Sequence, residues 1–301
     1  AKAEMKRTVH PVLAEAMMLC TALSALAQET ARIVAVNYPL QYFAQRLMGE
    51  GAEVVFPVPA DVDPSFWRPS IADISMIQAA DLILLNGAGF ASWVDRVSLP
   101  RSKVVNTTAA VKDRFIVTES ITHSHGDGGE HSHEGLASYT WLDPSMAIAQ
   151  AEAVAAAIIS KNLASDAFVT ARLDGLRSDL TALDTQARSR LDALRRTTII
   201  ATHPRYQYFA SRYDLSFLSL EWEAGSAPTQ GQLGALKALV EESGAKILIW
   251  EAEPTAGTFD TTANLGLENI VFSPLAHGAK GQTFLEAFQA SLSALSEMGG
   301  Q

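Results

Sequence analysis

Cysteine is almost absent from this chain of 301 residues, and several other features are missing as well. The single cysteine, Cys20, lies near the N-terminus, so the rest of the chain offers no disulfide and no thiolate metal ligand. No apolar run after it is long enough to span a bilayer. A basic stretch is missing too, and the net charge is −10. We therefore expect neither nucleic acid nor an anionic membrane surface as a partner, whereas a cationic ligand suits the charge.

The N-terminus has the pattern of a secretory signal peptide. Residues 5–7, Met-Lys-Arg, supply a start and positive charge, and the apolar segment 17–27 ends in the cleavage pattern Ala-Leu-Ala. Leu19 stands where a lipoprotein site needs a small residue before its cysteine, so Cys20 is expected to leave with the signal. We predict that residues 1–27 are the signal and that the mature protein is soluble and periplasmic. A buried N-terminal helix is the alternative.

Short apolar runs alternate with helical stretches along the chain, which is typical of a parallel α/β fold. The predicted strands are residues 33–36, 53–56, 81–85, 103–106, 198–201, 215–220, 246–250 and 269–272. Helices are predicted between them, including one after Gly89 that contains Trp93 and Val94. The fold class predicted from this order is α/β.

One long amphipathic helix is predicted over residues 166–196, between the two sets of strands. Leucines recur there at helical spacing, with charges between them and no proline. At 1.5 Å per residue this helix is about 45 Å long. A coiled-coil partner helix is the alternative, but the stretch contains few clean heptads.

An internal repeat relates the two sets of strands. The sequence QYFAQR at residues 41–46 matches QYFASR at residues 207–212, and the same spacing places Ile83 against Leu248. We predict two β-α lobes with parallel four-stranded sheets, joined by one long backbone helix. The predicted boundaries are 28–163 for the first lobe with a histidine loop at 122–135, 164–197 for the linking helix, and 198–301 for the second lobe. Ligands of open parallel sheets bind beyond the carboxyl ends of the strands, so facing lobes would share one cleft.

The histidine loop, residues 122–135, reads T-H-S-H-G-D-G-G-E-H-S-H-E-G. It holds four of the seven histidines of the chain, which are His123, His125, His131 and His133. No apolar residue interrupts it, so it is not part of a core. Neutral imidazole is a good ligand for zinc, copper, nickel and iron. The loop is therefore predicted to bind a transition metal, with a solvated polar loop as the alternative.

A further histidine and several carboxylates follow predicted strands. His203 follows the first strand of the second lobe. The carboxylates at such positions are Asp61, Asp63, Glu221, Glu223, Glu251 and Glu253. A lone histidine is usually structural and a lone carboxylate usually solvated, but a position beyond a strand favours ligand binding. His203 is therefore predicted to bind metal, and each carboxylate either binds the ion, orients an imidazole or is solvated.

These features together resemble the periplasmic receptors of zinc and manganese ABC importers. The resemblance covers about residues 32–298 and rests on the signal peptide, the two lobes, the long helix and His203. It also rests on a histidine-rich loop before Trp-Leu-Asp-Pro at residues 141–144. The resemblance implies one ion held between two lobes, usually by three histidines and often a carboxylate. It implies a membrane permease as partner and no enzymatic activity.

The sequence departs from this family at three ligand positions. Ser65 follows Asp63-Pro64 where the family has its first histidine, Tyr139 stands at the second, and the last carboxylate falls at about Ser273. Only His203 is carried over. Two explanations remain open. Either the histidine loop supplies the missing imidazoles, or the site has lost its usual ion and binds another ligand.

We favour the loop, because its imidazoles lie only a few residues before Tyr139 and a tetrahedral zinc site needs four ligands. The predicted ligands of Zn²⁺, or of Mn²⁺ or Cu²⁺ in its place, are His203 with His123, His125, His131 and His133. Glu223 or Glu251 would complete the set, and Asp63, Trp67 and Tyr139 would line the pocket. The expected protein is a monomer that delivers its ion to an ABC permease.

Three other functions fit the same sequence. The first is a receptor of this architecture for a non-metal ligand or a metal chelate, with Trp67, Trp93, Tyr139 and Trp222 in its cleft. The second is a periplasmic metal chaperone. The third is a metallohydrolase with Glu221, Glu251 or Glu253 as general base, although no Ser-His-Asp or His-Glu-x-x-His motif is present.

Overall fold

The computed structural model describes residues 30–118 and 135–300. The predicted signal peptide and the histidines His123, His125, His131 and His133 lie outside the described residues. By its contacts the chain divides into two units, Ala1–Thr30 and Ala31–Gln301, and the strands and helices below all belong to the second. Among the described residues, no helix is both long enough and apolar enough to cross a bilayer.

The first sheet consists of four parallel strands in the order β2-β1-β3-β4. These strands are β1 (Ala31–Ala35), β2 (Ala52–Val55), β3 (Leu82–Leu85) and β4 (Val104–Asn106). β1 lies in the centre, where Val34 aligns with Val55 on one side and Ile83 on the other. In β1 and β3, buried apolar side chains face both sides of the sheet, as expected for a parallel sheet covered by helices. Its helices are α2 (Tyr38–Met48), α3 (Ile71–Ala79) and α4 (Pro144–Ser160).

The second sheet repeats this topology. Its strands are β7 (Thr198–Ala201), β8 (Ser216–Ser219), β9 (Ile247–Trp250) and β10 (Glu268–Val271), in the order β10-β9-β7-β8. In both sheets the first strand lies between the second and the third, and the fourth pairs with the third. The predicted repeat is therefore confirmed at the level of strand order. The helices of this part are α6 (Gln207–Tyr213), α7 (Gln230–Ser243), α8 (Thr258–Ala263) and α9 (Phe284–Glu297).

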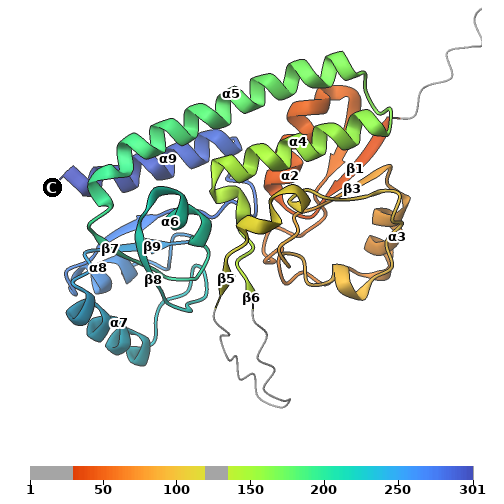
Figure 1. The fold of residues 1–301 in the computed structure, drawn as a ribbon. Coiled ribbons are helices and arrows are strands. Elements are labelled where there is room, and N and C mark those ends of the chain that lie inside the picture. Colours follow the sequence, from red (N-terminus) through yellow and green to blue (C-terminus); the bar gives the residue numbers. More distant parts are fainter. Residues whose placement is uncertain (1–29, 119–134, 301) are drawn as a thin grey trace, which may run out of the picture. The chain divides into compact units, whose positions relative to one another are not determined.

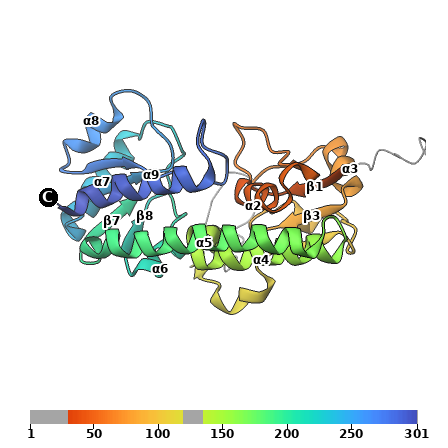
Figure 2. The same ribbon diagram turned by 90° about the horizontal axis from the view of Figure 1, so that it is seen from above.

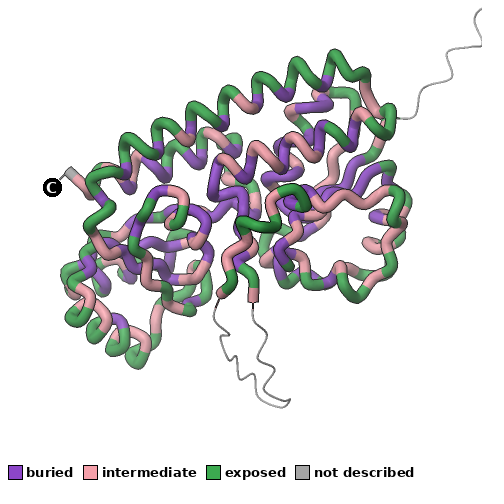
Figure 3. Tube along the Cα trace, viewed as in Figure 1, coloured by how far each residue is buried: buried purple, intermediate pink, exposed green. Residues whose placement is uncertain are grey.

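A single long helix, α5 (Asp166–Leu191), connects the two parts. It begins at Ser165, whose side chain accepts a hydrogen bond from the amide of Phe168. One stripe, including Leu173, Leu176 and Leu180, is buried against α4 and α9, while the outer side of the helix is exposed (Figures 1, 2 and 3). The predicted fold class, two β-α lobes with parallel four-stranded sheets joined by one long helix, is confirmed.

One predicted helix differs from the structure, and two observed features were not predicted. The helix predicted after Gly89 is only a single 3-10 turn, Val94–Arg96, and the positive φ of Gly87, Ala88 and Gly89 belongs to the turn that precedes it. The short helix α8 was not predicted. Nor was an antiparallel pair, β5 (Val117–Thr118) with β6 (Gly135–Leu136), which brings the two flanks of the segment 119–134 together.

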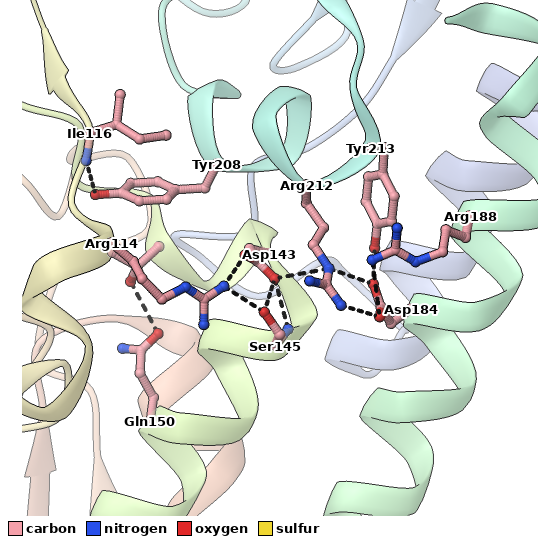
Figure 4. Close-up of polar contacts among 11 residues, drawn as sticks. Arg114, Ile116, Asp143, Ser145, Gln150, Asp184, Arg188, Tyr208, Arg212 and Tyr213 are labelled. Carbon is pink, nitrogen blue, oxygen red and sulfur yellow. Dashed lines mark hydrogen bonds and ion pairs between the residues drawn. The ribbon is translucent and has the colours of Figure 1, made fainter.

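Ion pairs join the N-cap of α4 with α5 and α6 (Figure 4). Asp143, the N-cap of α4, accepts from Arg114 at 2.7 Å and lies 3.5 Å from Nε of Arg212 on α6. Arg212 also binds Asp184 on α5, with Nη2 2.6 Å from Oδ2, and the Tyr213 hydroxyl donates to Oδ1 at 3.0 Å. Burial alone would raise the pKa of Asp184, but the bonds from Arg212 and Tyr213 outweigh it and lower that pKa. Asp184 therefore stabilises the folded state as an anion.

Replacing Asp184 with asparagine is expected to lower the free energy of unfolding by about 2 kcal/mol at pH 7. A carboxyl group with a lowered folded pKa stabilises above its unfolded pKa of about 3.9, and this contribution is lost as the pH falls through the folded value. The difference between the two proteins should thus be constant above about pH 5 and shrink below about pH 4. Urea unfolding of both proteins at pH 7 and at a pH below about 4 measures this difference in the free energy of unfolding.

Asp179→Asn is the matched control for this experiment. Asp179 also lies on α5 and pairs with an arginine, Arg46, at 2.7 Å, but its side chain is 46% exposed. We expect this variant to lose no more than about 1 kcal/mol. Equal losses for Asp184→Asn and Asp179→Asn, or a loss for Asp184→Asn that does not depend on pH, would contradict the assignment.

Candidate functional site

A cleft of about 940 Å³ lies where loops from the carboxyl ends of both sheets meet. The loop after β2 contributes Asp61, Asp63 and Phe66, and Tyr139 contributes from the segment before α4. The residues after the strands of the second sheet include His203, Arg205, Glu221, Trp222, Glu223, Glu251 and His277. The cleft therefore has the position that open parallel sheets favour for ligands.

His203 is fixed by a carboxylate from the neighbouring strand. It follows β7, and Glu251 follows β9, which pairs with β7 directly. Nδ1 of His203 lies 3.1 Å from Oε2 of Glu251. Because a carboxylate accepts, this contact places the proton of a neutral imidazole on Nδ1 and leaves the lone pair on Nε2. The His203 side chain is 26% exposed, so the ring is partly accessible from the cleft.

Arg205, two residues further along, was not singled out from the sequence. Its Nε donates to Oε1 of Glu251 at 2.9 Å and its Nη2 to Oδ2 of Asp63 at 2.6 Å. The guanidinium lies 4.7 Å from the centre of the Tyr139 ring, within the range of a cation–π contact. Arg205 thus connects the loops of the two sheets. Its position two residues after His203, at the same strand end, was the sequence signal that could have identified Arg205 as a cleft residue.

The three positions that the resemblance compares with family ligands, Ser65, Tyr139 and Ser273, carry side chains with contacts of their own. Ser65 donates to Oδ1 of Asp63 from its amide at 2.8 Å and from its hydroxyl at 2.6 Å. Tyr139 is buried against Phe90 and Trp141, and burial raises the pKa of its hydroxyl, which stays protonated. Ser273 Oγ accepts from the amide of Leu275 at 3.3 Å.

The remaining predicted residues fall in different places. Glu223 lines the cleft, as do Asp63, Tyr139 and Glu251. Trp67 does not line it, because the indole is buried edge-on against Trp93 and borders a neighbouring hollow of about 440 Å³. His277 lines the cleft, but its Nε2 lies 2.6 Å from the carbonyl oxygen of Val62, which makes that nitrogen a donor.

The charge of the cleft favours a cation. The carboxylates of Asp61, Asp63, Glu221, Glu223 and Glu251 line it together with the single guanidinium of Arg205. Yet within residues 30–118 and 135–300, no three His, Cys, Asp or Glu side chains are grouped so that they could hold a metal ion. The described residues thus contribute one oriented imidazole in acidic surroundings, and not a complete metal cage.

Comparisons with known proteins agree with this architecture. The family model described as "ZnuA: Zinc-uptake complex component A periplasmic" matches residues 33–298. The "High-affinity zinc uptake system protein ZnuA" of Bacillus subtilis is 24% identical over 286 residues, which cover 88% of this chain and 86% of that protein. The "Zinc-binding lipoprotein AdcA" of Streptococcus pneumoniae is 23% identical over 282 residues, but the match covers only 56% of its length.

A solved structure has the same fold. The crystal structure of the Zn(II)-bound ZnuA-like domain of Streptococcus pneumoniae AdcA superposes with a TM-score of 0.76 at 19% identity. The match covers 90% of this chain and all of that domain. At this identity the likeness concerns the fold, and the ligands of the cleft must be argued from the residues of this chain.

Proposed function

The chain belongs to the ZnuA family of periplasmic zinc-uptake components, and on this premise we propose that it is a receptor that captures one zinc ion in the cleft and delivers it to an ABC permease. Membership in a receptor family supports a carrier that releases its ion unchanged, and not an enzyme. We further propose export by residues 1–27, action in the periplasm as a monomer, and no binding of nucleic acid, in keeping with the net charge of −10.

The orientation of His203 is the observation that carries this proposal. Its Nδ1 is held by Glu251 at 3.1 Å, so Nε2 is the nitrogen available for an ion in the cleft. A metal-binding histidine usually donates a hydrogen bond from its other ring nitrogen to a carboxylate, which fixes the ring and makes it more basic. Glu251 therefore supports His203, and of the two carboxylates predicted to complete the site, Glu223 is proposed as the ligand.

The other ligands are proposed to come from His123, His125, His131 and His133. These residues lie outside the described part, but both flanks of their segment are described. Thr118 and Gly135 pair in β5 and β6, and Tyr139 in the cleft wall follows Gly135 by four residues. Four residues span at most about 14 Å, so one flank lies close to the cleft. Two or three of these imidazoles with His203 would satisfy the four-ligand preference of zinc.

Native mass spectrometry of the purified full chain tests the proposal. Incubation with an equimolar mixture of zinc and manganese is expected to give one adduct with the mass of a single zinc ion. Loss of that adduct after treatment with a chelator, and its return on adding zinc, would support a receptor for a free ion. A chain that remains without zinc under these conditions would contradict the proposed function.

The size of the cleft favours one second candidate, a receptor for a metal chelate or another small organic ligand. A volume of about 940 Å³ is far larger than a single ion needs, and Phe66 at its rim is 67% exposed. Tyr139 and Trp222 add aromatic surface to the walls. An organic adduct in the same mass spectra of protein purified from its host would support this candidate over the free ion.

A further inference from the structure

We propose that Arg205 sets the ion preference of the cleft: it holds the carboxylates of Asp63 and Glu251, so that imidazole nitrogen is left as the main donor for a metal. The inference rests on the proposed function, because it concerns which ion the same cleft accepts. It assigns to Arg205 a specificity-determining role that does not require the arginine to touch the ion.

The contacts of the two carboxylates account for all four of their oxygens. Arg205 donates to Oε1 of Glu251 at 2.9 Å and to Oδ2 of Asp63 at 2.6 Å. The second oxygen of Glu251 holds His203, and the second oxygen of Asp63 accepts from Ser65 twice. An ion that approached either carboxylate would also approach the guanidinium, whose positive charge repels it.

Burial keeps Arg205 in this position. Its side chain is 10% exposed and that of Glu251 is 9% exposed. The guanidinium also lies over the Tyr139 ring, at 4.7 Å from its centre. Swinging the arginine away would leave a buried carboxylate without its partner, and such a loss is strongly unfavourable. We therefore expect the ion pairs to persist when a metal ion enters the cleft.

The chemistry of the available donors then selects among ions. Manganese, magnesium and calcium prefer carboxylate and other oxygen ligands, whereas zinc is well served by imidazole. With Asp63 and Glu251 bound to Arg205, the cleft presents the nitrogen of His203, and two of its five carboxylates are withheld from an ion. Without the guanidinium, Oε1 of Glu251 and Oδ2 of Asp63 would lose their donor, and such oxygens are the ligands that manganese prefers.

The alternative is that Arg205 only ties the loops of the two sheets together. A purely structural contact would change the affinity for zinc and manganese by the same factor when it is removed. The ratio of the two affinities therefore separates the two roles, whereas stability alone does not.

The test uses the full chain with Arg205→Met, in which an unbranched apolar side chain retains packing over Tyr139 without the charge. Zinc and manganese affinities are measured by calorimetric titration, with a competing chelator where binding is tight. We expect the preference for zinc over manganese to fall at least about tenfold, chiefly through stronger manganese binding. A preference within twofold of the wild type would overturn the proposal.

Arg212→Met is the matched control. Arg212 is also an arginine between two aspartates, Asp143 and Asp184, but it does not line the cleft. We expect its loss to leave the preference for zinc unchanged. An equal fall in both variants would mean that the effect is not specific to Arg205 and would overturn the proposal.

Arg205→Lys decides the question if Arg205→Met does not fold, as judged by circular dichroism. Lysine retains the charge but lacks the two-pronged geometry that bonds both carboxylates at once. A zinc preference lowered at least threefold supports the proposal, and an unchanged preference overturns it. A wild-type chain that binds neither ion would refute the proposed function, while manganese binding gained only in Arg205→Met would still support the role of Arg205.

Discussion

Replacing His203 with alanine is expected to weaken zinc binding by more than about a hundredfold. Loss of a residue that merely orients a metal ligand already costs about 10- to 100-fold in affinity, and loss of the ligand itself should cost more. His203 is the histidine whose Nδ1 is held by Glu251, with its other nitrogen available to the acidic cleft. Calorimetric titration of zinc into the wild type and His203→Ala measures the change.

His277→Ala is the control for this substitution. His277 also lines the cleft, but its Nε2 is engaged with the carbonyl oxygen of Val62 at 2.6 Å and its ring packs against Phe56. We expect zinc affinity to stay within about threefold in this variant. Affinity that is unchanged in His203→Ala, or reduced equally in both variants, would show that the assignment of His203 is wrong.

Replacing the four loop histidines together is expected to weaken zinc binding at least as much as His203→Ala. The variant carries serine at His123, His125, His131 and His133, which preserves the length of the loop. The reason is that two or three of the proposed four ligands are lost at once. A single His→Ser change should cost less, because the remaining loop imidazoles can replace the missing one.

The zinc affinities of these two variants show whether the loop histidines bind the ion or only gather ions near the protein. If the loop histidines only gather ions near the protein, the variant with all four His→Ser changes should retain the equilibrium zinc affinity of the wild type and bind zinc more slowly. That result would leave His203 without its proposed partners. A circular dichroism spectrum identical to that of the wild type is the check that the fourfold change does not disturb the fold.

Much of the fold was predictable because its central strands, β1, β3, β7 and β9, are short, largely buried and apolar on both faces. The strand predicted at 246–250 is β9, Ile247–Trp250, in which every residue is buried. Leucine spacing revealed the long helix, although α5 ends at Leu191 and continues only as a 3-10 turn. Helix α8 was not predicted because its sequence, TFDTTA, is rich in threonine and has no helical spacing of apolar residues.

The cleft was predictable in its position but not in its contacts. Strand ends identified His203, Glu251 and Asp63, since parallel strands bring such residues to one edge. The pairing of Arg205 with Asp63 joins residues 142 positions apart, and no sequence pattern reports a contact of that kind. Trp67 was expected in the cleft from its aromatic character alone, and packing against Trp93 places it elsewhere.

The position of the ion itself tests the account most directly. Crystals of the zinc-loaded full chain, measured at and below the zinc absorption edge, would locate the metal by its anomalous scattering. We predict one peak in the cleft at about 2.0–2.1 Å from Nε2 of His203, with loop imidazoles completing the coordination. A peak that does not involve His203, or a cleft that stays without zinc in the loaded crystals, would contradict it.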